Sequence, residues 1–544
     1  MGSSTSHLEP SEPFTLSLGS QGSVTGLILG ENHNVRRFAG IPYAKPPLGN
    51  LRWRKPVPLS LDHIYEGEVT GTPLDCREMR NVSPQPSYFL HGRKLGAIPD
   101  DKFSEDCLMV NIWTPNEEPP EDSGGWPVFA WIHGGWLQIG SPSHAIQDDP
   151  TELIDKDGGN LQAIVVSIGY RLNVFGFLSG LDEVKGNFGF WDQRLGLEWI
   201  RGHITHFGGD PENVTLGGLS AGAYSVHAQL NYELREDKDT DLLFQRVIMF
   251  SNAIPTQPKP YLEAKDQFGE LCNIAGISRD NSPADQLDKL RQVPANELIK
   301  LISQMKQHTF RAVTDDEFIA STLAEEQQNG TFAARFAKKE IKIMIGEVEN
   351  EESVYAAINP PKSFSDFLAE LANYYGPEVA KKLTTAYPPL PADASPEDCS
   401  TRFGKIVSDV QVRIPIRMLV NDLVNGGVDR TSILRYRISF RPSSFDNVFH
   451  TNMGVGHAFD AAVWWFGKRL GLTPSEEKAV KAWLVLLQKL IRGEQTDEWS
   501  CPTVRAYRQL QSDGTIAVKD DQQWGELLTL SETLRFRDDE VDMG

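Results

Sequence analysis

The sequence predicts an α/β fold in which a mostly parallel sheet is covered by helices on both faces. Short apolar, β-branched runs recur along the chain without the polar alternation of a solvated sheet face, as in buried parallel strands. Helical patterns separate these runs, and strands that alternate with helices form a doubly wound sheet. The predicted strands lie at 128–132, 163–167, 214–216, 246–250 and 341–345, and the clearest helices between them lie at 192–200 and 221–230.

Two further segments, at about 258–340 and 360–430, are predominantly helical and polar. No low-complexity linker separates either of them from the strands around it. We therefore predict a single domain over residues 1–544, with these segments as helical insertions over the sheet and a polar tail at about 1–14.

Composition excludes several classes of function. A net charge of −21 and a pI near 5.1 argue against nucleic-acid binding, which requires a basic surface. No apolar run reaches the roughly 18–20 residues of a membrane span. The start of the chain lacks a basic segment and an apolar core, which favours a cytoplasmic location unless a secretory leader has been removed. The five cysteines show no zinc-ligand spacing, so we expect no metal.

The strongest local signal is the Gly-Leu-Ser-Ala-Gly motif at 218–222, between a predicted strand and a predicted helix. A sharp strand-to-helix turn presents the serine of such a motif at the top of the sheet as a nucleophile. The residues two before and two after the serine must be small, because larger side chains would collide across the turn. We predict Ser220 as the nucleophile; the alternative is a glycine-rich turn around an ordinary serine.

A second motif, His-Gly-Gly-Trp at 133–136, directly follows the predicted strand 128–132. In esterases an HGGG-type motif at this place supplies backbone N–H groups for the oxyanion. The N–H of Ala221, at the start of the helix after Ser220, is a further donor candidate. The alternative is a loop whose glycines only permit a turn.

Four histidines follow Ser220, and the base is chosen from them by elimination. His227 lies too close to Ser220 on the following helix, and His308 precedes every good acid candidate. Of the remaining pair, His457 lies in a glycine-flanked loop before an apolar helix and is preferred to His450.

The acid should lie just past the end of a strand, and the loop after 341–345 fits this place. Four carboxylates compete there, Glu347, Glu349, Glu351 and Glu352, and spacing alone does not choose between them.

Long motifs in a fixed order identify a family resemblance. The chain resembles the type-B carboxylesterases, the cholinesterase-like family, and most of all its fungal members. The resemblance is strong to about residue 255 and patchy afterwards. The motifs that carry it are FAGIPYA (38–44), PPLG (46–49), LRW (51–53), SEDCL (104–108), NIWTP (111–115), GNFG (186–189) and FGGDP (207–211).

This resemblance implies an α/β-hydrolase fold with the insertions over the active site and no cofactor. It implies Glu351 as the acid and His457 as the base. It implies oxyanion donors at Gly135, Trp136 and Ala221, and a disulfide between Cys76 and Cys107.

The resulting expectation is a serine carboxylic-ester hydrolase that acts through an acyl-enzyme on small to medium, apolar esters. Trp136 stands where the family has a third glycine, and Leu219 replaces a common glutamate, so the site is expected to be apolar and confined. No tryptophan lies between Cys76 and Cys107, which argues against a choline ester. The alternatives are an acyltransferase or cyclase with the same triad, and a catalytically silent binding or adhesion protein.

Overall fold

The computed structural model of the chain describes residues 11–30, 32–90, 93–95, 98–142, 149–236, 242–532 and 534–535. Within these residues a 13-stranded sheet forms the centre of the molecule. Its main strands are β1 (Glu12–Ser17), β2 (Ser23–Leu29), β3 (Val35–Pro42), β7 (Met109–Pro115), β8 (Trp126–Ile132), β9 (Ile164–Ile168), β10 (Gly209–Leu219), β11 (Arg246–Phe250), β12 (Lys342–Val348), β13 (Ile433–Ile438), β14 (Ala506–Leu510) and β15 (Ile516–Asp520). The short β4 (Leu74–Asp75) pairs with β2, and β5 (Phe89–Leu90) and β6 (Arg93–Lys94) pair with each other.

The central part of the sheet is parallel, in the order β9-β8-β10-β11-β12-β13-β14. Antiparallel strands extend it at both edges, β1-β2-β3-β7 on one side and β15 on the other. The predicted mostly parallel sheet is therefore confirmed. Because parallel strands end at the same edge, the loops after β8, β10 and β12 come together there.

The polar tail predicted for residues 1–14 is shorter than expected. Residues 1–10 lie outside the described part of the chain, whereas Glu12 already begins β1. The strand begins this early because β1 pairs with β2 from Glu12, opposite Ile28, to Ser17, opposite Ser23. The Phe14 ring also packs edge-on against Phe38 of β3 at 6.2 Å between centroids.

Alternate residues of each central strand lie in two hydrophobic cores, one on each face of the sheet. Val128, Ala130 and Ile132 of β8 belong to the core that includes α3 (Phe188–His203) and α4 (Ala221–Arg235). Phe129 and Trp131 point to the opposite core, which includes α16 (Pro474–Ile491). Burial on both faces explains why these strands show no polar alternation.

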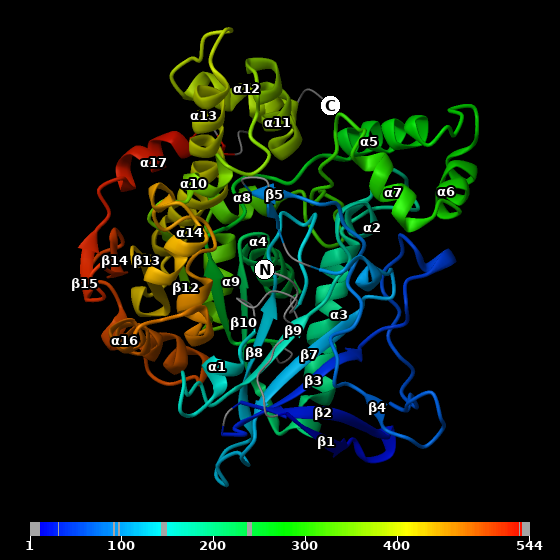
Figure 1. Cartoon of the computed structure of the whole chain (residues 1–544). Helices are drawn as coiled ribbons and strands as arrows, with labels where there is room; N and C mark the ends of the chain where they lie inside the picture. The colour runs from blue at the N-terminus through cyan, green and yellow to red at the C-terminus, as the bar shows by residue number, and fades with distance from the viewer. Residues whose placement is uncertain are drawn as a thin grey trace.

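In the view of Figure 1, helices α5, α6 and α7 of the first predicted insertion and α11, α12 and α13 of the second lie above the sheet, whereas α9 and α14 lie at the height of its strands. The first contains α5 to α9 and the second contains α11 to α14. The remaining helices are α1 (Thr151–Ile154), α2 (Asn173–Phe177), α5 (Tyr261–Ile274), α6 (Pro283–Arg291), α7 (Ala295–Ile302), α8 (Leu323–Gln328), α9 (Thr331–Lys338), α10 (Glu352–Tyr355), α11 (Phe364–Tyr375), α12 (Pro377–Ala386), α13 (Pro396–Ser408), α14 (Ile414–Asn425), α15 (Ala461–Trp464) and α17 (Trp524–Ser531).

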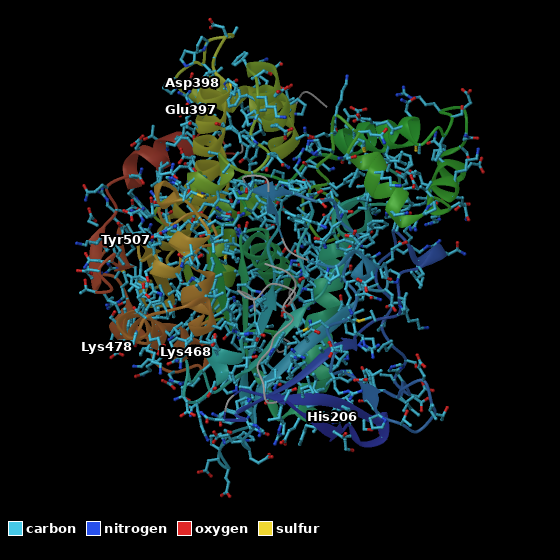
Figure 2. The ribbon with its side chains drawn as sticks, viewed as in Figure 1. His206, Glu397, Asp398, Lys468, Lys478 and Tyr507 are labelled. Carbon is cyan, nitrogen blue, oxygen red and sulfur yellow. The ribbon has the colours of Figure 1, made fainter. Side chains whose placement is uncertain are left out.

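Helix α13 connects the outer end of the second insertion with the site below it. It begins with a capping box formed by Ser395 and Asp398, and Figure 2 places Glu397 and Asp398 at the far end of the insertion. At its other end the chain continues as a π-helical turn, Asp409–Arg413, before α14. Such turns often mark functional sites, and Gln411 of this turn reaches the cavity described below. None of the helices in the described ranges is long and apolar enough to cross a membrane.

Candidate active site

Ser220 lies at the sharp turn between β10 and α4. Its backbone has φ 57° and ψ −125°, a strained conformation for a residue with a side chain. The flanking glycines are required sterically: a Cβ on Gly218 would lie 2.4 Å from the carbonyl carbon of Gly222, and one on Gly222 would lie 2.0 Å from the Ile132 oxygen. The Ser220 N–H donates to the Phe250 carbonyl at 2.8 Å, which ties the turn to β11.

The structure brings Ser220, His457 and Glu351 into one hydrogen-bonded chain. His457 Nε2 lies 2.8 Å from Ser220 Oγ, and His457 Nδ1 lies 2.6 Å from Glu351 Oε2. All three side chains are buried, with Glu351 fully inaccessible. The other Glu351 oxygen accepts the Val348 N–H at 2.9 Å, which holds the carboxylate in place.

The loops that bear the acid and the histidine are joined directly to each other. The Asn350 N–H donates to the Val455 carbonyl, and the Asn350 side-chain oxygen accepts the Val455 N–H, each at 3.0 Å. Gly454 leaves room for this amide, since a Cβ there would lie 2.0 Å from the Asn350 oxygen. This pairing fixes the spacing between Glu351 and His457, which lie on different segments of the chain.

The other acid candidates have different surroundings. Glu347 is buried among arginines, Glu349 is exposed, and Glu352 forms an ion pair with Arg413. Glu352 therefore has a partner of its own outside the chain of hydrogen bonds.

The other histidines also lie elsewhere. His227 accepts the Ile254 N–H at 3.1 Å, and burial lowers its pKa to about 3. His308 lies 3.4 Å from Glu370, and the ring of His450 accepts the Asn452 N–H at a helix start.

The segment after β8 forms the wall beside the serine. Gly134 lies directly against Ser220, because a Cβ there would be 3.1 Å from the serine Cβ. Gly135 has φ 114° and its carbonyl accepts the N–H groups of Gln138 and Ile139, which closes a tight turn. Within the described part of the chain, the N–H groups of Gly135, Trp136 and Ala221, which were predicted as oxyanion donors, donate no hydrogen bond.

Sequence reasoning did not single out Tyr355, which packs against the histidine. The Tyr355 hydroxyl lies 3.1 Å from His457 Nε2, and the two rings are 4.7 Å apart between centroids. The available signal was its position one helical turn after Glu351, which places it on the same side of α10. Tyr355 also meets Trp136 edge-on, and Trp136 stacks on Tyr88.

A cavity of about 110 Å³ opens beside Ser220. Trp136 and Ala221 line it near the serine, and Tyr224 lines it from α4. The two insertions complete it: the first contributes Lys259 and Arg311, and the second contributes Tyr374 and Tyr375. None of these last residues was predicted, because the side chains of the insertions cannot be placed from a single sequence.

The disulfide expected between Cys76 and Cys107 is not formed in this structure. Both residues are free thiols, buried in the core beside β3 and β7. Burial raises the pKa of Cys76 to about 12 and raises that of Cys107 well above its ordinary value, so both thiols stay protonated. Among the described residues no group of histidine, cysteine and acidic side chains could hold a metal ion.

Comparison with known proteins gives a consistent assignment. A sequence model of the carboxylesterase family matches residues 15–491. The chain is 42% identical to an uncharacterised esterase/lipase of Schizosaccharomyces pombe, over 94% of this chain and 95% of that one. It is 34% identical to a carboxylic ester hydrolase of Gibberella moniliformis over 94% of both chains, and 33% identical to a para-nitrobenzyl esterase of Bacillus subtilis over 67% and 69%. The chain therefore belongs to the carboxylesterase family, and it is a carboxylic ester hydrolase with the α/β-hydrolase fold.

Proposed function

We propose that this protein hydrolyses esters through a Ser220–His457–Glu351 triad and an acyl-enzyme intermediate. The observation that supports it best is the continuous hydrogen-bonded chain from Ser220 Oγ through the imidazole to Glu351. Three buried side chains from separate loops meet in the geometry that this chemistry requires.

In the first step His457 Nε2 takes the proton of Ser220 as the serine oxygen attacks the ester carbonyl carbon. Glu351, bonded to Nδ1, orients the ring and stabilises the imidazolium that forms. The negative charge on the carbonyl oxygen is held by the N–H groups of Gly135, Trp136 and Ala221. The imidazolium then protonates the leaving alcohol, and water attacks the acyl-enzyme with His457 again as the base.

The substrate that the cavity favours is a small to medium ester with an apolar part near the serine. Trp136, Tyr224, Tyr374 and Tyr375 offer aromatic surface to such a group. The Trp136 indole, held between Tyr88 and Tyr355, narrows the space beside the serine, so esters of tertiary alcohols should be poor substrates. We assign water as the acyl acceptor because no feature of the described cavity selects another, and the complete triad argues against a silent binding protein.

The test is hydrolysis of p-nitrophenyl acetate and butyrate by the wild type and by Ser220→Ala. We expect kcat/KM to fall at least about a thousandfold in the variant, because an intact triad contributes this much or more. Ser303→Ala, on the exposed surface of the first insertion, is the matched control and should keep wild-type activity. Equal rates in Ser220→Ala and the wild type would refute the proposal.

A further inference from the structure

The cavity beside Ser220 has a basic wall that ester hydrolysis itself does not need. Lys259 precedes α5, and Arg311 lies in the segment between α7 and α8. The Lys259 side chain is buried, with only 3% of the residue exposed. A lysine is almost never buried to this degree unless an acceptor or an anion satisfies its ammonium group.

The hydrogen bonds of the protein satisfy this wall only in part. An ammonium group has three N–H donors, and one of those of Lys259 is bound by the Gln267 side-chain oxygen at 2.5 Å. The Gln267 amide nitrogen donates to the Gln307 and Thr309 carbonyls, which fixes its oxygen toward the lysine. Arg311 forms an ion pair with Glu263 through one terminal nitrogen. Its Nε is buried and has no partner within the described residues.

The charges on this wall do not balance. When Lys259 is protonated, it and Arg311 are two cations, and among the described residues Glu263 is the one carboxylate that acts on both. The nearby phenols, Tyr224 and Tyr375, are kept neutral because burial raises the pKa of each. Burial, and after it the charge of Arg311, lowers the pKa of Lys259 to about 7, and an anion bound beside the ammonium group would raise this pKa and keep the group charged.

We propose that the natural substrate carries a carboxylate, and that Lys259 and Arg311 bind this group while the ester carbonyl lies at Ser220. The inference rests on the hydrolase mechanism proposed above, and it adds the class of ester. The aromatic side chains near Ser220 contact the apolar part of the molecule, and the basic wall binds its charged end. A carboxylate in the cavity would supply acceptors for the Lys259 donors that the described residues leave unpaired, and its charge would offset one of the two cations.

Two pairs of matched esters test the proposal and locate the charge. In the first pair, the carboxylate lies on the acyl side: the p-nitrophenyl half-ester of adipic acid against the same compound with its free acid methylated. In the second pair it lies on the alcohol side: 4-acetoxybenzoate against methyl 4-acetoxybenzoate. The wild type should show a higher kcat/KM for the anionic member of at least one pair.

Lys259→Met, which keeps the length of the side chain, should lower this preference about 10- to 100-fold, since a hydrogen bond to a charged group contributes about 1.5–3 kcal/mol. The change should appear mainly in KM, and the preference is measured in each variant as the ratio of kcat/KM for the anionic ester to kcat/KM for its neutral partner. Lys265→Met is the matched control, because Lys265 is exposed on α5 and should leave the preference unchanged. Arg311→Gln provides a second variant if Lys259→Met does not fold, as judged by its melting temperature.

The proposal is overturned if the wild type hydrolyses neither anionic ester better than its neutral partner. It is equally overturned if a folded Lys259→Met or Arg311→Gln keeps the full preference. In both cases Ser220-dependent hydrolysis of the neutral esters would leave the hydrolase mechanism intact. Absence of any Ser220-dependent hydrolysis would refute the mechanism and this inference together.

Discussion

Glu347 lies just before the last residue of β12, and Glu351 follows the strand; both are buried, yet their surroundings are opposite. Glu347 binds Arg417 at 2.8 and 3.0 Å and is paired with Arg437, which also donates to Tyr507 of β14. Burial alone would raise the pKa of Glu347, but the charges of Arg417 and Arg437 outweigh it and hold the pKa well below the usual range.

Glu351 has no such cation among the described residues. Its hydrogen-bond partners are the His457 ring and one backbone N–H. The negative charge of Glu347 is balanced permanently, whereas in the proposed mechanism that of Glu351 is left available for a positive charge that forms on the imidazole. The proposed roles of the two carboxylates therefore differ through their partners, because residue type and burial are the same.

The largest effect should come from Glu351→Gln, which keeps the shape of the side chain and removes its charge. We expect kcat/KM for p-nitrophenyl butyrate to fall about 10⁴-fold, because an amide neither fixes the right tautomer nor stabilises the imidazolium. Glu349→Gln, an exposed neighbour in the same loop, should stay within about twofold of the wild type. A loss of less than tenfold in Glu351→Gln would assign the acid role to another residue.

Glu347→Gln should have the opposite effect: it should lower the free energy of unfolding strongly and kcat/KM only slightly. Removing one member of a buried ion pair typically costs about 3–5 kcal/mol, and here Arg417 would lose its main partner. The loss of unfolding free energy is measured as a shift of the urea midpoint. Because the pKa of Glu347 is lowered on folding, its contribution is present above its ordinary value of 4.5 and is lost as the pH falls below it. Unfolding curves that match the wild type at pH 7 would contradict the structural assignment.

Some elements of this fold can be predicted from the sequence, whereas the difference between these two glutamates cannot. The parallel strands β8 to β12 were predicted because their burial on both faces leaves a continuous apolar run. The parallel strands β13 and β14 were not predicted, because arginines interrupt their apolar residues. β10 was predicted as 214–216 but begins at Gly209, where the chain is polar and pairs only with Trp126. Strand pairing there is set by the neighbouring strand rather than by local composition.

The site was predictable where backbone geometry restricts the residue type, as at Ser220 between its two glycines. The choice of Glu351 over Glu347 was not, because it depends on partners far along the chain: Arg417 on α14 and Val455 beside the histidine. The prediction of Glu351 as the acid came from the family resemblance instead. Lys259 and Arg311 were missed for the same reason, since each acquires its position from packing of the first insertion against the site.

A third buried carboxylate, Asp460, has neither an arginine nor an imidazole as a hydrogen-bond partner. The residue is fully inaccessible, one oxygen accepts the Trp464 indole N–H at 2.8 Å, and Oδ1 has no partner in the described part of the chain. Burial and the negative charge of Glu351 raise the pKa of Asp460 to about 7. Its ordinary value is 3.8, so between these pH values the folded protein keeps a proton that the unfolded chain has lost.

Stability should therefore fall as the pH rises from about 4 to 7 and then level off, so that Asp460 destabilises the fold at pH 8. Asp460→Asn cannot ionise and should remove this part of the slope, with a gain of about 1–3 kcal/mol at pH 8 and none at pH 4. Urea midpoints at intervals from pH 4 to 8.5 measure it, with the exposed Asp393→Asn as control. If the Asp460→Asn and wild-type curves run parallel over this range, Asp460 is ionised in both states and its charge is balanced by a group other than Trp464. The distinction drawn from the two glutamates would then fail at Asp460, a buried carboxylate on which the charge of Glu351 acts.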